Sequence, residues 1–214
     1  MMTYETVHTL RELVGDSAKM YQDHPFLRYV KDDQIHSETF AEFQTQAYAI
    51  GAWVAELAEK LGHKPRIAMM SANSPLYVKM LIGVICGGGI SVLMDPQASL
   101  DVLCGCMNKA EVDMLILDPQ IRMDLSKIRE RCEKLTDILY MAEGERPNCG
   151  SILETYAGRN ETPDIKPEDC AAILFTSGTT GEEKGVMLSH ANLVDSVFNT
   201  NHAKGSIKLN ILPM

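Results

Sequence analysis

Short apolar runs alternate with helical segments through the middle of the chain, and this alternation restricts the fold more than any other feature of the sequence. Because strands that alternate with helices pair in parallel through right-handed crossovers, helices cover both faces of the sheet. We therefore predict an α/β fold, a layered αβα sandwich around a largely parallel sheet, with ligands bound at the carboxyl ends of the strands. The expected strands are 66–72, 90–95, 114–118 and 137–142, and the expected helices are 74–87, 99–110 and 120–135.

The segment before this region is predicted to form a helix, a β-hairpin and a longer helix. The first helix covers 6–21, and the hairpin turns at Asp32-Asp33 between strands 26–30 and 34–38. The longer helix begins after Thr39 as N-cap and stops at Gly62. Its apolar residues recur at spacings of three and four, which is typical of a face packed on a core, at Phe40, Phe43, Ala47, Ile50, Val54, Leu57 and Leu61.

Two later segments, 143–151 and 159–169, are rich in charged residues and proline and are predicted to be loops. The second is a candidate boundary, which would divide the chain into an α/β subdomain over 1–160 and a phosphate-loop segment over 161–214.

The last predicted strand, 170–175, leads directly into a segment of hydroxyl and glycine residues. Glycines permit a close approach of the backbone, so successive N–H groups can converge on an anion. Hydroxyls add uncharged donors, and a lysine supplies a positive charge. This composition predicts a loop that binds a polyphosphate, and the candidate residues are Thr176, Ser177, Gly178, Thr179, Thr180, Gly181 and Lys184.

A hairpin loop without a ligand is the alternative that this composition leaves open. Two commoner phosphate-binding motifs are excluded by their spacing. The Walker pattern places its lysine between a glycine and a serine or threonine, whereas Lys184 precedes Gly185. The glycines at 87–89 lack the GxGxxG spacing of a dinucleotide-binding motif.

The charge balance disfavours two classes of partner. The chain has 20 Lys and Arg residues against 29 Asp and Glu residues, a formal net charge of -9, so we expect no nucleic-acid partner. The longest apolar run, 80–94, is interrupted by glycines and is shorter than the roughly 20 residues that span a bilayer, so we expect no membrane span. The N-terminal segment has acidic residues and no apolar core typical of a secretion signal, which predicts a cytoplasmic protein.

The six cysteines form no CxxC pair and no set at zinc-ligand spacing, so we predict reduced and mostly buried thiols. For Cys104-Gly-Cys106, a redox or metal pair is the alternative to helix packing.

The residues 175–193, FTSGTTGEEKGVMLSHANL, resemble the phosphate-binding signature of the adenylate-forming (AMP-binding) superfamily, which includes acyl-CoA synthetases and the adenylation domains of peptide synthetases. Two more blocks are similar to that family in the same order: HSETFAEFQTQAYAIGAWV, and SANSPLYVKMLIGVICGGGISVLMDP with its ending Leu93, Asp95 and Pro96. The resemblance implies that these 214 residues are the N-terminal portion of the large domain of such an enzyme, without the C-terminal lid. We expect this portion alone to be catalytically inactive.

The resemblance also implies a reaction. A carboxylic acid attacks the α-phosphate of Mg²⁺-bound ATP to give an acyl-adenylate, and the thiol of CoA or of a carrier protein then takes the acyl group. The seven candidate residues would hold the ATP phosphates, and none of them is implied to be catalytic. Which residue contacts Mg²⁺ is left open. An acyl-CoA synthetase is the favoured interpretation; an amino-acid-activating domain and a non-catalytic nucleotide-binding or scaffold protein are the alternatives.

For His190 we predict a structural role, in which it caps or orients a helix that begins near Ala191 while Asn192 bonds to the preceding loop. A proton carrier is the alternative. The other histidines, His8, His24, His36, His63 and His202, show no ligand spacing and are predicted to be surface or satisfied core residues. Asp95-Pro96 is predicted to be a turn at a strand end.

Glu183 stands where the family usually has proline. Proline would restrict the loop, whereas glutamate leaves more entropy to lose and brings a carboxylate towards a polyanion. We therefore expect Glu183→Pro to raise the ATP affinity of the full-length protein and to make binding less sensitive to salt. Calorimetric titration with ATP at two salt concentrations measures both effects, and equal affinities for the two proteins would contradict the idea.

Overall fold

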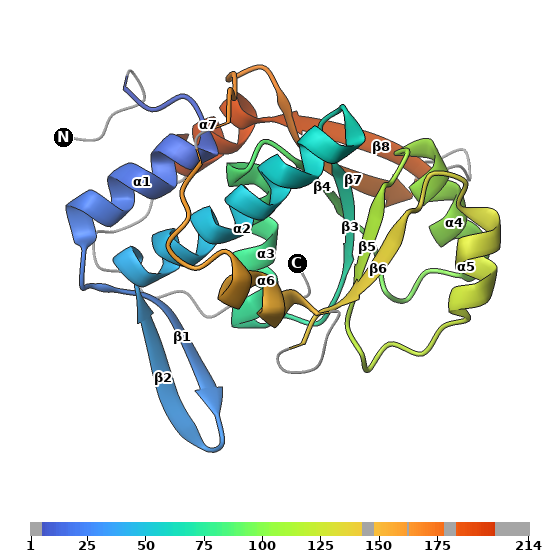
Figure 1. The fold of residues 1–214 in the computed structure, drawn as a ribbon, viewed down its shortest axis with the longest axis horizontal. Coiled ribbons are helices and arrows are strands. Elements are labelled where there is room, and N and C mark those ends of the chain that lie inside the picture. Colours follow the sequence, from blue (N-terminus) through green and yellow to red (C-terminus); the bar gives the residue numbers. More distant parts are fainter. Residues whose placement is uncertain (1–5, 143–147, 162, 178–182, 200–214) are drawn as a thin grey trace.

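The middle layer of the protein is a six-stranded sheet with the strand order β6-β5-β3-β4-β7-β8 (Figure 1). The computed structural model describes residues 6–142, 148–161, 163–177 and 183–199. Strands β3 to β7 pair in parallel, and only the edge strand β8 runs antiparallel to its neighbour β7. The predicted largely parallel sheet is thus confirmed. Its strands are β3 (Arg66–Met70), β4 (Ile90–Leu93), β5 (Met114–Leu117), β6 (Asp137–Tyr140), β7 (Cys170–Ser177) and β8 (Glu183–Ser189).

Helices cover both faces of this sheet because successive residues of each strand point to opposite sides. In β3, Ile67 and Met69 pack into one core with helices α2, α3 and α6, whereas Ala68 and Met70 pack into a second core with α4 and α5. A third apolar cluster joins α1, α3 and α7. The helices are α1 (Leu10–Tyr21), α2 (Phe40–Leu61), α3 (Pro75–Cys86), α4 (Leu100–Lys109), α5 (Leu125–Arg131), α6 (Cys149–Thr155) and α7 (His190–Asn199).

The N-terminal elements follow the prediction closely. Strands β1 (Pro25–Lys31) and β2 (Gln34–Thr39) form an antiparallel hairpin, which turns at Asp32 and Asp33 with φ of 51° and 56°. Helix α2 begins after Thr39, whose hydroxyl accepts the Glu42 N–H, and ends at Gly62 with φ of 73°. Only α1 differs, because its N-cap is Thr9 and the helix therefore starts four residues later than predicted.

Three elements differ from the prediction in extent or kind. Helix α5 is much shorter than the expected 120–135, since the Asp124 side chain caps its first turn. Helix α6 begins inside the predicted loop 143–151, where Asn148 accepts the Ser151 N–H at 3.0 Å. The strand β8 was not predicted at all. Strand β7 lies beyond the candidate boundary near residue 160 and pairs with β4 in the same sheet.

The cysteines pack as ordinary residues of the apolar core. All six cysteines are unpaired thiols and five are buried, as predicted; Cys104 and Cys106 lie on α4 in the second core. No His, Cys, Asp and Glu cluster suited to a metal ion occurs among the described residues.

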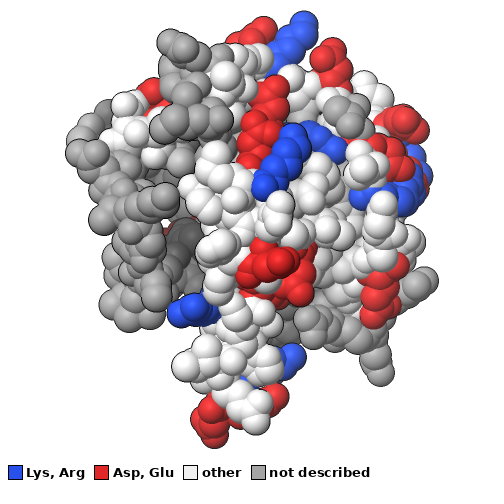
Figure 2. Space-filling view, turned by 90° about the vertical axis from the view of Figure 1, so that its left-hand side faces the viewer, with Lys and Arg blue, Asp and Glu red and all other residues white. Residues whose placement is uncertain are grey.

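On the face shown in Figure 2, the described Lys and Arg side chains lie interspersed with Asp and Glu side chains. Within the described part of the chain, no helix is both long and apolar enough to cross a membrane.

Helices α2 and α3 approach each other so closely that glycine is required at the contact. A Cβ atom on Gly87, which caps α3, would lie 2.6 Å from the carbonyl oxygen of Gly51 in α2. A Cβ atom on Gly83 would lie 2.6 Å from the Cβ of Ile50. Both distances are shorter than a van der Waals contact, so any larger residue would have to push the two helices apart.

We expect Gly87→Ala to destabilise the fold by about 1 to 3 kcal/mol, because the added methyl group meets backbone and cannot be accommodated by a side-chain rotation. Urea unfolding followed by circular dichroism measures the change. Gly105→Ala is the matched control, since this exposed glycine of α4 has open space around it. That substitution should instead stabilise the protein by about 0.5 to 1 kcal/mol through helix propensity. Equal effects of the two substitutions would contradict the close-packing argument.

Candidate phosphate-binding site

The predicted phosphate loop connects the antiparallel strands β7 and β8. Thr176 and Ser177 end β7, and Lys184 is the second residue of β8. In the strand register, Thr176 lies opposite Lys184 and Ser177 lies opposite Glu183. Because β7 and β8 pair directly, no other element is needed to bring the two ends of the motif together. Four candidate residues, Gly178, Thr179, Thr180 and Gly181, lie outside the described residues.

The motif lies at the carboxyl edge of the parallel strands, where the fold was predicted to bind ligands. Strand β4 pairs with β7 in a register that places Leu93 opposite Leu174. Asp95 forms the predicted turn at the strand end, since its Oδ1 accepts the Gln97 N–H at 2.8 Å.

The two faces of the β7–β8 hairpin have different surroundings. Phe175 packs into the core below α4, and a Cβ atom on its partner Gly185 would lie 3.3 Å from the Phe175 ring. Because side chains alternate along a strand, Glu183 shares the face of Gly185, whereas Lys184 points to the opposite face. Lys184 is exposed, and no ion pair joins it to another residue of the described part of the chain.

One contact at the site could not be foreseen from the sequence. The Nζ atom of Lys109, the last residue of α4, donates a hydrogen bond of 2.9 Å to the main-chain oxygen of Glu183. The two residues are 74 positions apart, and neither shows a motif that would link them. The antiparallel strand β8 was not predicted, because its exposed residues lack a clear alternation of apolar and polar side chains.

His190 is buried at the start of α7, where it connects this helix to α1 through a hydrogen bond. Its Nδ1 atom accepts the backbone N–H of Leu10 at 3.3 Å, so Nδ1 carries no proton. Burial lowers the pKa of His190 to about 4, an effect opposed by the nearby Asp169 and Glu12 carboxylates and reinforced by Lys64. The ring is therefore neutral at neutral pH and acts as a hydrogen-bond acceptor.

The structural role predicted for His190 is confirmed, but the helix it serves is α1 and not α7. The N-terminus of α7 is capped by Ser189, whose Oγ atom accepts the Asn192 N–H at 3.2 Å. Asn192 returns the bond, since its Oδ1 atom accepts the Ser189 N–H at 3.1 Å. Asn192 thus bonds to the segment before the helix, as predicted.

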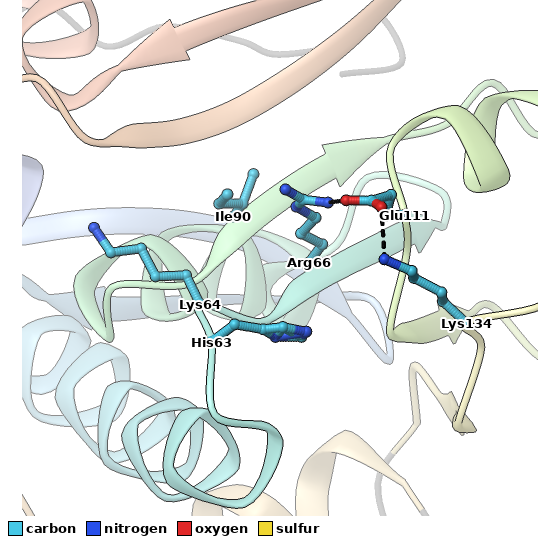
Figure 3. A pocket seen from close by; sticks show the side chains of 6 residues that line it. All are labelled: His63, Lys64, Arg66, Ile90, Glu111 and Lys134. Atoms are coloured by element: carbon cyan, nitrogen blue, oxygen red, sulfur yellow. Dashed lines mark hydrogen bonds and ion pairs between the residues drawn. The ribbon is translucent and has the colours of Figure 1, made fainter.

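The opposite, amino edge of the sheet carries a cavity of about 220 Å³ (Figure 3). Its basic side chains are all paired with carboxylates. Lys64 pairs with Asp169 at 2.6 Å, and Glu111 binds both Lys134, at 2.5 Å, and Arg66. Lys134 and Arg66 together lower the pKa of the Glu111 carboxyl to about 2. This edge therefore offers no unpaired cation to an anionic ligand among the residues that line the cavity, which are His63, Lys64, Arg66, Ile90, Glu111 and Lys134.

The remaining described histidines occupy surface positions or have partners, as predicted. His63 lies 3.2 Å from the Asp113 carboxylate, the ring of His24 contacts the Tyr21 carbonyl at 2.7 Å, and His36 stacks on Tyr29. His202 lies outside the described residues.

The sequence matches the AMP-binding enzyme family over residues 14–214, so the chain belongs to this family. It is 28% identical over 209 residues to a long-chain-fatty-acid–CoA ligase (ACSBG2) of Mus musculus, an alignment that covers 89% of this chain and 30% of that protein. It is also 22% identical over 210 residues to surfactin synthase subunit 1 of Bacillus subtilis, covering 96% of this chain and 5% of that protein.

Solved structures support the same fold. A fatty acyl-adenylate ligase from L. pneumophila, solved with acyl adenylate and pyrophosphate, superposes with a TM-score of 0.69 at 22% identity and covers 91% of this chain and 32% of its own. The chain spans 26 to 30% of the length of the first three fatty-acid–CoA ligases that it matches. It therefore corresponds to less than a third of such an enzyme.

The depressed pKa of His190 predicts a loss of stability in acid. The His190 ring takes up a proton near pH 6.5 in the unfolded chain and only near pH 4 in the folded chain. The stability contributed by the neutral, buried ring is therefore present above pH 6.5 and is lost as the pH falls towards 4. We expect a loss on the order of 2 kcal/mol across that window. Urea unfolding at pH 7, 6 and 5 measures it.

His190→Asn retains an acceptor oxygen and does not titrate, so its stability should depend less on pH over the same window. His24→Asn, at an exposed position, is the control and should behave as the wild type does. A wild-type pH dependence in the His190→Asn variant would show that another group is responsible.

Proposed function

We propose that this chain holds the phosphates of ATP in an enzyme that activates a carboxylic acid. The acid attacks the α-phosphate of ATP, which gives an acyl-adenylate and releases pyrophosphate, and the thiol of CoA then takes the acyl group and releases AMP. Membership of the AMP-binding family and the fatty-acid–CoA ligases among the relatives support this proposal.

The observation that carries the proposal is the contrast between the two edges of the sheet. At the carboxyl edge, Lys184 is exposed and lies opposite Thr176, next to the glycine-rich segment. At the amino edge, the basic groups around the cavity are paired with carboxylates. An exposed lysine beside hydroxyl and backbone donors suits a polyphosphate, whose negative charge needs both a cation and directed hydrogen bonds.

Each candidate residue has a role in this proposal. Thr176, Ser177, Thr179 and Thr180 would donate hydroxyl hydrogen bonds to phosphate oxygens, and Gly178 and Gly181 would let the backbone approach. Lys184 would neutralise charge on the phosphates as they separate from the α-phosphate. Mg²⁺ would share that charge when bound with ATP; the hydroxyls are oxygen donors of the kind it prefers, although none is assigned to it.

A second candidate function is the activation of an amino acid for a carrier protein, which the similarity to surfactin synthase subunit 1 favours. The chemistry of the first step would be unchanged. The acceptor distinguishes the two, since one enzyme transfers the acyl group to CoA and the other to the thiol of a carrier-protein domain.

We expect the full-length protein to exchange labelled pyrophosphate into ATP in the presence of one class of carboxylic acid. The test set contains fatty, aryl and amino acids, with CoA or a carrier protein added afterwards to identify the acceptor. The chain of 214 residues, assayed beside it, should show no exchange.

Lys184→Ala combined with Thr180→Ala should lower the exchange rate by about 100-fold or more, because directed donors to the reacting phosphates are lost. Lys127→Ala removes an exposed lysine of α5 that pairs within its own helix, and it should leave the rate unchanged. Absence of exchange with every acid, from a folded full-length protein, would favour a nucleotide-binding or scaffold protein without chemistry.

A further inference from the structure

Lys109 lies at the end of α4, close to the phosphate-loop motif. The residues around it, Cys106 and Ala110, are buried, so the helix end is fixed against the second core. From this position the Lys109 side chain reaches the first residue of β8 and donates its hydrogen bond to the Glu183 carbonyl. A helix packed on the core is thereby connected to the strand that carries Lys184.

The Glu183 carbonyl belongs to the same planar peptide unit as the Lys184 N–H. A hydrogen bond to that oxygen therefore restricts the rotation of the peptide that joins the two residues. Since neighbouring side chains of a strand point to opposite faces, the same restraint helps to keep the Lys184 side chain on the face away from α4.

The carboxylate of Glu183 lies on the α4 side. It contributes with burial to the raised pKa of the Cys106 thiol, while Lys109 opposes that rise, so both charged groups act on the same part of α4. The positive charge of Lys109 thus stands near the carboxylate that would otherwise repel a polyanion at this loop.

We propose that Lys109 is a positioning residue for the phosphate-binding site: it anchors the Glu183–Lys184 peptide and offsets the Glu183 carboxylate. It supplies part of the restraint that a proline at position 183 would give through its fixed φ. The effect on ATP rests on the proposed function, whereas the effect on the backbone does not.

Two variants of the full-length protein test the anchor. Lys109→Met keeps the length of the side chain and removes its donor and charge, and Lys109→Arg restores both. Lys127→Met is the control for lost charge, because this lysine pairs with Asp124 at its own helix. Each variant is also made with Glu183→Pro, which removes the carboxylate and stiffens the chain.

The first measurement is amide hydrogen exchange over residues 183–186 without nucleotide. Lys109→Met should exchange roughly three- to tenfold faster than the wild type, as expected for the loss of one solvent-exposed hydrogen bond, and Lys109→Arg should restore the wild-type rate. Equal rates in Lys109→Met and Lys127→Met would overturn the anchor.

The second measurement is the KM for ATP and the kcat in pyrophosphate exchange. Lys109→Met should raise the KM by a similar factor with little change in kcat, and the increase should be smaller in the Glu183→Pro background. An unchanged KM, or the same increase in both backgrounds, would overturn the role at the site. Absence of exchange in the wild type would instead contradict the proposed function, and the hydrogen-exchange result would still decide on the anchor.

Discussion

The contact between helices α2 and α3 is the constraint on which the rest of the structure depends. Gly87 and Gly51 let the two backbones touch, and Gly83 makes room for Ile50. This contact fixes α3 against the first core and so fixes the strands on either side of it, β3 and β4. Strand β4 in turn pairs with β7, which carries the phosphate-loop motif. The position of the candidate site is therefore determined by helix packing on the opposite side of the sheet from α4.

The two edges of the sheet differ in how their charges are used. At the amino edge, carboxylates from the segments before β5 and β7 pair with the basic residues. Glu111 joins the neighbouring strands β3 and β5, and Asp169 joins the segments before β3 and β7, which lie on either side of β4. Exposed ion pairs of this kind add little stability, but they leave no unpaired cation among the described residues that line the cavity. At the carboxyl edge, Lys109 binds a neutral carbonyl and Lys184 remains exposed. Among the described residues, an anion would thus meet an unpaired lysine at the carboxyl edge but none in the lining of the cavity at the amino edge.

Features encoded by neighbouring residues could be predicted from the sequence, and those that depend on distant residues could not. Helix α2 was predicted to its last residue because Thr39 and Gly62 mark its ends through local hydrogen bonds and a left-handed backbone. The start of α6 was missed because Asn148 caps a helix in a segment of loop-like composition. The contact between Lys109 and Glu183 exists only because the fold brings α4 to β8. For the same reason, the sequence showed that His190 was structural but not which helix it serves.

The hydrogen bond between Leu10 and His190 joins residues that are 180 positions apart. During synthesis, helix α1 cannot complete its packing until the segment that contains His190 has left the ribosome. At typical rates of about 5 to 20 residues per second, the helix would wait roughly 10 to 40 seconds for its partner. Throughout that interval its apolar face, which includes Leu10 and Leu13, would lack the contact with Val194 of α7. Helix α1 is thus synthesised first, but it completes its packing only after the segment that contains His190 has been synthesised.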